Sequence, residues 1–202
     1  MKRAAAVLAA FLSIGAHAEE TAAPQWEFNA SGYWNMPRGE DAFATGIFIA
    51  KHGPLHLEAR ANYEAVHAQS AFVGWNFSWG KELVVEATPI VGGATGAARG
   101  PIVGLEATVS YGKFDWYLEA EHVRDRADSH FNYAWTELGW RPVECLRLGF
   151  AGQHTQVYGG GDRTTERGPF VQFTYGKVTV GGYWFNPGAS DQVAVGMVAV
   201  GF

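Results

Sequence analysis

Cysteine is the rarest residue type in this 202-residue chain, which contains only Cys145. One thiol cannot close an internal disulfide, so the fold must be held by packing and hydrogen bonds. We expect Cys145 to be a small buried side chain. Beyond residue 18 there is no run of roughly 18 apolar residues, which excludes a transmembrane helix. Linkers and composition breaks are also missing, and residues 19–202 are therefore expected to form one domain.

Positive charge is scarce as well, with 15 Lys and Arg against 20 Asp and Glu. The basic residues are dispersed along the chain, so we expect no nucleic-acid partner. No cofactor motif is present, and we expect no cofactor. The pairs His56-x-Glu58 and Glu119-x-Glu121 each put two potential metal ligands on one strand face. Neither matches a known ligand motif, and we expect no metal.

The N-terminal segment has the features of a secretory signal peptide. Basic residues occupy positions 2–3, residues 4–15 form a short apolar stretch, and residues 16–18 (Ala-His-Ala) form a small-x-small cleavage site. We therefore expect residues 1–18 to be a signal peptide that is removed on export. The remaining residues, 19–202, would be a single mature domain.

Five short turns, each with a basic residue, recur about every thirty residues along the chain. They lie at 51–54, 79–82, 111–114, 140–143 and 175–178. Longer Gly- and Asp-rich connections alternate with them. The expected strands are 25–36, 42–51, 54–65, 69–79, 82–91, 101–111, 113–123, 130–140, 143–156, 165–175, 177–186 and 191–202.

Apolar and polar residues alternate in several of these segments. In 55–64, for example, Leu55 and Leu57 share one face, and His56 and Glu58 share the other. The sequence therefore predicts an all-β fold, a transmembrane antiparallel up-and-down β-barrel of about twelve strands. Ten strands is the alternative count, since some segments alternate weakly. A soluble β-sandwich or lipocalin-like barrel is the alternative fold.

The apolar faces end in aromatic residues beside the short turns, which is typical of a membrane boundary. These residues are Trp79, Tyr111, Phe114, Trp140 and Tyr175. Short turns at one rim and longer loops at the other are the asymmetry of outer-membrane barrels, with the short turns in the periplasm. The basic turn residues would then set a ring of positive charge at that rim.

The last segment, 191–202, is an apolar strand that ends on Phe202. It resembles the sorting signal of bacterial outer-membrane barrels. The resemblance implies a Gram-negative outer membrane, contact with the lipid bilayer and lipopolysaccharide, and reading of Phe202 by the barrel-assembly machinery. In size the chain also resembles small twelve-stranded channel families, such as the oligosaccharide-specific porins for acidic sugars. No activity motif of those families matches.

Extending the alternation gives a set of candidate pore-lining residues rich in carboxylates. They are Glu58, Arg60, Glu86, Glu106, Tyr117, Glu119, Glu121, Tyr133, Trp135, Glu137 and Arg147. Glu27, Glu64 and Asp115 are further inward carboxylates, and Arg60 and Arg147 are the two inward basic residues. A channel for anions should line its pore with Arg and Lys. The acidic-sugar analogy therefore fails here, and the lumen should favour cations or neutral solutes.

Two features of this interior have alternative interpretations. The charged residues could pair into a network that plugs the barrel, but two arginines cannot neutralise the carboxylates, which favours a lumen filled by water. Tyr133 and Trp135 point inward if Glu137 does, and could form a stacking platform for a flat solute. Packing against a neighbouring strand, or a one-residue register error, is the favoured interpretation of these rings.

Three functions follow from these observations. The first is an outer-membrane channel for small cationic or neutral solutes, and the second is a closed structural or interaction barrel. The third and weakest is a surface hydrolase at the outer rim. Its candidate residues are His67, His122, His130, His154, Asp125, Asp128 and Ser129. No spacing among them supports a catalytic set, so we expect no catalytic residues and no enzyme.

Overall fold

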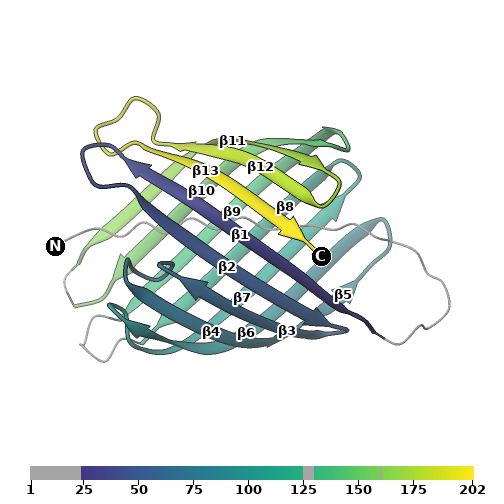
Figure 1. The fold of residues 1–202 in the computed structure, drawn as a ribbon, viewed down its shortest axis with the longest axis horizontal. Helices are drawn as coiled ribbons and strands as arrows, with labels where there is room; N and C mark the ends of the chain where they lie inside the picture. Colours follow the sequence, from purple (N-terminus) through teal and green to yellow (C-terminus); the bar gives the residue numbers. More distant parts are fainter. Residues whose placement is uncertain (1–23, 125–129, 160) are drawn as a thin grey trace.

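The computed structural model describes residues 24–124, 130–159 and 161–202. The expected signal peptide, 1–18, lies outside the described residues. The described residues form one antiparallel sheet that closes on itself, as the sequence predicted (Figure 1). None of them belongs to a helix that is long and apolar enough to cross a membrane.

Consecutive strands pair with one another except β4 and β5, and the sheet closes where the first and last strands meet. The strands are β1 (Trp26–Pro37), β2 (Phe43–His52), β3 (Leu55–Ala61), β4 (Ala68–Trp75), β5 (Phe77–Trp79), β6 (Leu83–Gly96), β7 (Gly100–Tyr111), β8 (Phe114–Val123), β9 (Phe131–Val143), β10 (Leu146–Val157), β11 (Arg163–Tyr175), β12 (Val178–Phe185) and β13 (Val193–Gly201). β4 and β5 both pair with β6 and act as one barrel strand interrupted at Asn76. The described residues therefore close a twelve-stranded barrel.

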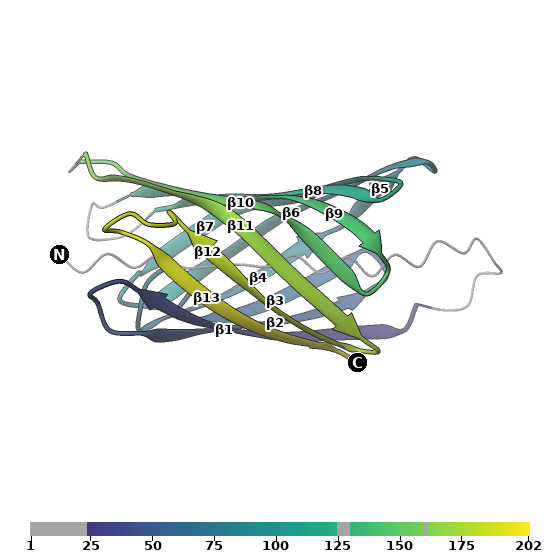
Figure 2. The same ribbon diagram turned by 90° about the horizontal axis from the view of Figure 1, so that it is seen from above.

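Closure satisfies the backbone groups that an open sheet would leave unpaired, which is a requirement in lipid. β1 pairs with β13 from Asn29–Gly201 to Pro37–Val193. At the C-terminus the Phe202 N–H donates to the Phe28 carbonyl oxygen at 2.9 Å. The strands run obliquely to the long axis of the barrel, and the short turns lie together at one end (Figure 2).

The outer face is a band of exposed apolar side chains, such as Leu57, Val103 and Leu138. The aromatic residues predicted at the short-turn rim are all exposed, and Tyr175 is 83 % exposed. Such a surface would be costly in water and suits a bilayer with aromatic rings at its boundary. On β3 and β8 the alternation has the predicted sense, with apolar residues outside and polar residues inside. The inner face of β13 is instead apolar, with Val193, Val195 and Met197 buried in a hydrophobic cluster.

Two predicted connections are wrong in their limits. Residues 92–100 were expected to be a loop, yet β6 continues to Gly96 and β7 begins at Gly100. Gly92 belongs in the strand because β4 approaches closely there, and an added Cβ would lie 2.0 Å from the Ala71 carbonyl oxygen. At the same end of β4, β3 ends at Ala61 instead of residue 65, and the next residue, Asn62, adopts a φ of 56°.

The turn expected at 140–143 lies three residues later, with Glu144 and Cys145 at its centre. β9 continues because the Arg141 N–H donates to the Lys113 carbonyl oxygen at 2.8 Å. The register between β9 and β10 shifts between Leu146 and Leu148, beside Pro142, which has no N–H for the ladder. Cys145 is consequently exposed in the turn, and the prediction that it is buried is wrong.

Candidate functional site in the barrel interior

Inward residues of β3, β7 and β8, with Glu64 from the loop after β3, form a cluster around one guanidinium, here called the Arg60 cluster. Its members are Arg60, Glu58, Glu64, Glu106, Glu119 and Glu121. Arg60 Nε lies 2.7 Å from Glu58 Oε1, and Arg60 Nη1 lies 2.7 Å from Glu121 Oε1 and 3.2 Å from Glu119 Oε1. Glu64 and Glu106 are each 3.8 Å from the guanidinium. Five carboxylates therefore share one cation.

Aromatic rings hold the Arg60 guanidinium in place. It lies 4.4 Å from the centroids of both Tyr63 and Phe72, a distance at which cation–π attraction is effective. Tyr63 also donates its hydroxyl to Glu119 Oε1 at 2.8 Å. The side chain of Arg60 is 0 % exposed, so the cation is fixed in geometry and removed from bulk solvent. The cluster is a buried part of the barrel wall.

A second cluster, the Arg147 cluster, is nearer the short-turn end and comprises Arg147, Asp115, Glu137, Arg141 and Gln172. Arg147 pairs with both Asp115 and Glu137, and its Nη1 donates to Gln172 Oε1 at 3.2 Å. Arg141 also pairs with Asp115. Two cations thus face two carboxylates, and this cluster is balanced in formal charge. The sequence had assigned Arg141 to the positive ring at the rim, and the structure turns its guanidinium inward.

The carboxylate excess is therefore localised. It belongs to the Arg60 cluster, where formal negative charges exceed positive ones by four when all are ionised. The sequence predicted the excess but not its position. Nor could it pair Arg60 with Glu121, because those residues are 61 positions apart and meet only once the barrel is closed.

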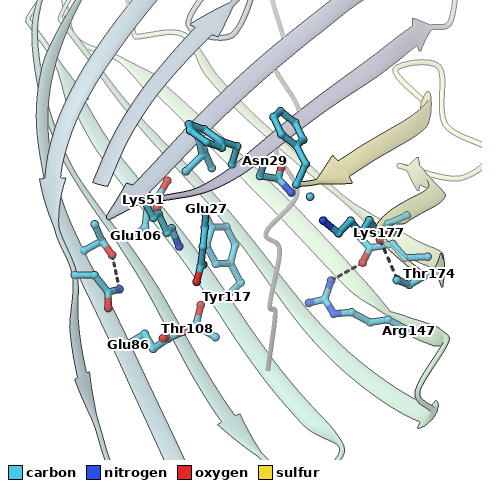
Figure 3. A pocket seen from close by; sticks show the side chains of 18 of the residues that line it. Glu27, Asn29, Lys51, Glu86, Glu106, Thr108, Tyr117, Arg147, Thr174 and Lys177 are labelled. Carbon is cyan, nitrogen blue, oxygen red and sulfur yellow. Dashed lines mark hydrogen bonds between the residues drawn. The ribbon is translucent and has the colours of Figure 1, made fainter. Parts of the chain in front are cut away.

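A cavity of about 860 Å³ opens at the short-turn end of the barrel. Side chains from several strands point into it, among them those of Glu27, Glu86, Glu106, Lys51 and Lys177 (Figure 3). Tyr117 and Arg147 also line it. Acidic and basic groups both line this cavity. Glu106 belongs to both the cavity wall and the Arg60 cluster, and so it connects them.

The structure places the predicted candidates as follows. Glu58, Arg60, Tyr117, Glu119, Glu121, Tyr133, Trp135, Glu137 and Arg147 are buried inside the barrel. Glu86 and Glu106 are partly exposed and line the cavity. Glu86 was grouped with Arg60 and Arg147 as a possible single network. Instead the two arginines centre separate clusters.

On β9, Tyr133 and Trp135 point inward together with Glu137, as the sequence predicted. Trp135 is 0 % exposed and packs edge to face on Tyr183 and Phe185, with ring centroids 5.6 Å and 5.4 Å away. Its indole N–H donates to Glu137 Oε1 at 3.1 Å. Trp135 therefore packs on neighbouring rings and leaves no open face for a stacked solute, in agreement with the favoured interpretation.

The outer-rim histidines do not assemble a catalytic set in the described residues. His122 Nδ1 lies 2.7 Å from Asn132 Oδ1, and His154 Nδ1 lies 2.7 Å from Thr165 Oγ1. The candidates Asp125, Asp128 and Ser129 lie outside the described residues. An imidazole–carboxylate contact occurs inside the barrel instead, where His56 Nε2 is 3.2 Å from Glu58 Oε2.

This fold is shared with solved bacterial outer-membrane porins. The KdgM porin, solved in complex with disordered oligogalacturonate, has a TM-score of 0.63 at 8 % identity and covers 86 % of this chain and 99 % of its own. The outer membrane protein Omp33 of Acinetobacter baumannii has a TM-score of 0.52 at 15 % identity, over 90 % of this chain and 100 % of its own. Searches with the sequence match no family model and no curated protein. The likeness establishes the porin-like barrel fold.

Proposed function

We propose that the chain is an outer-membrane channel of a Gram-negative bacterium for small cationic or neutral solutes. The observation that carries the proposal is the Arg60 cluster, in which five carboxylates surround one guanidinium inside the barrel. An excess of fixed negative charge along a path attracts cations and repels anions. The cavity at the short-turn end gives solutes a way to reach Glu106 from the periplasm.

The proposal keeps the fold of the KdgM porin but not its solute. Oligogalacturonate, which that porin holds, is an acidic sugar. In the present chain such a polyanion would meet the carboxylate excess of the Arg60 cluster. Glu119 and Glu58 are buried beside Arg60, so their charge is screened less than that of exposed groups. An anionic oligosaccharide is therefore not the solute that this interior favours.

The test is conductance in planar lipid bilayers after removal of the charge. We expect the purified barrel to conduct with a preference for cations, and the triple variant Glu58→Gln, Glu106→Gln and Glu119→Gln to lose that preference. Glu40→Gln, in an exposed outer loop, is the matched control and should keep it. Retention of the preference by the triple variant would remove the assigned role of the cluster.

A closed envelope barrel is the second candidate, because interactions of the Arg60 region extend across the interior. Arg60 on β3 reaches β8, and the Tyr63 ring lies 5.6 Å from the Tyr133 ring on β9. These contacts would block the lumen if no path passes beside them. The same bilayer measurement separates the two candidates, because correctly folded protein without conductance would support the closed barrel.

A further inference from the structure

Three potential metal ligands meet on the wall between the Arg60 cluster and the cavity. His56, Glu58 and Glu106 each offer one ligand atom, and these atoms all lie within 4.8 Å of one another. His56 and Glu58 are two residues apart on β3 and so share its inner face. Glu106 comes from β7, beyond β4 and β6. The residue that pairs with His56 on β4 is Gly74, which adds no side chain of its own to this part of the wall.

The burial of these groups differs in a way that suits a ligand entering from the cavity. His56 is 0 % exposed and Glu58 is 4 % exposed. The Glu106 side chain is 13 % exposed and forms part of the cavity wall. A solute that enters at the short-turn end therefore meets Glu106 first, with the imidazole of His56 behind it. His56 and Glu58 thus form a buried pair of ligands, and Glu106 is the third ligand, which a solute in the cavity can reach.

Two observations show unmet bonding capacity at this point. The His56 Nδ1 atom is buried without a hydrogen-bond partner, although Nε2 contacts Glu58. The Arg60 cluster, to which Glu58 and Glu106 belong, carries more carboxylates than its one guanidinium neutralises. Buried polar atoms and charges without partners are costly, and a cation bound to these ligands would offset the excess of carboxylates.

We propose that His56, Glu58 and Glu106 bind a divalent transition-metal cation of the Zn²⁺ type on the lumen wall. One imidazole and two carboxylates are a ligand set that Zn²⁺ accepts, with a fourth position left for water. Zn²⁺ ligands at about 2.1 Å lie roughly 3.4 Å from one another in a tetrahedral site, so small side-chain rotations close this one. The site does not depend on conduction, since a closed barrel with the same cavity would also bind the ion.

The experiment is a Zn²⁺ titration of the purified, folded barrel in detergent, by calorimetry or by competition with a chromogenic chelator. We expect one Zn²⁺ per barrel and a loss of affinity of at least about tenfold in Glu106→Gln and His56→Gln. Glu86→Gln is the matched control, because Glu86 lines the same cavity outside the three-ligand group. Its affinity should equal that of the unaltered chain.

The electrophoretic migration of each variant in an SDS gel, compared before and after boiling, reports whether the variant is folded. If His56→Gln does not fold, Glu106→Gln still decides, because Glu106 is the most exposed of the three ligands. X-ray absorption of the Zn²⁺-loaded protein should show one imidazole among oxygen ligands. Absence of saturable binding, or equal affinities for Glu106→Gln and Glu86→Gln, would overturn the proposal whatever the bilayer measurements give.

Discussion

Gly139 makes room for the Arg147 guanidinium. A Cβ added there would lie 2.5 Å from Arg147 Nε and 2.7 Å from Asp115 Oδ2. We expect Gly139→Ala to displace the buried ion pair and to lower the free energy of unfolding by about 1–3 kcal/mol. Urea unfolding in detergent micelles measures this change in the free energy of unfolding. Gly46→Ala, where an added Cβ meets nothing within 4 Å, is the control, and an equal cost in both variants would contradict this account.

Arg60 and its carboxylates are not equivalent in their contributions to stability. Removal of Arg60 leaves five carboxylates without their shared cation, so Arg60→Met should cost about 3–5 kcal/mol. Glu119→Gln should cost less, because it relieves repulsion and its amide oxygen still accepts the Tyr63 hydroxyl. The comparison uses the same urea unfolding. If Glu119→Gln is as destabilising as Arg60→Met, the excess charge is not felt in the folded state.

At the scale of the strand, alternation was enough to assign side chains to the inner and outer faces. Glu137 was expected inside and Leu138 outside, and the structure has them 0 % and 60 % exposed. Strand limits were harder to predict where glycine or proline is present. Gly92 reads as a loop residue but lies in a strand because of a close backbone approach. Pro142 reads as a turn residue but lies beside a register shift.

The corrected position of the turn between β9 and β10 can be tested directly. Cys145 is exposed there, so a polyethylene-glycol maleimide should modify the folded barrel as readily as the unfolded chain. A cysteine placed at Ala199, which is 1 % exposed, in a Cys145→Ser background should react only after unfolding. Protection of Cys145 in the folded state would return the turn to 140–143.

At the scale of the whole molecule, closure of the barrel creates contacts between distant strands that the sequence could not show. The sequence predicted the inward carboxylates by name, because each follows from a period of two along its own strand. Which of them share Arg60 depends on how far strands distant in the sequence are separated around the barrel. Arg60 is on β3 and Glu119 on β8, so their contact exists only in the closed sheet. The two arginine clusters differ in net charge because the closed barrel decides which carboxylates meet each arginine.

The central claim is that this interior passes cations in preference to anions. The most direct measurement is the reversal potential of the purified barrel in a planar bilayer under a potassium chloride gradient. A potential with the sign of potassium selectivity is the predicted result, since five carboxylates of the interior share one guanidinium. A chloride-selective potential, or no conductance from folded protein, would contradict it.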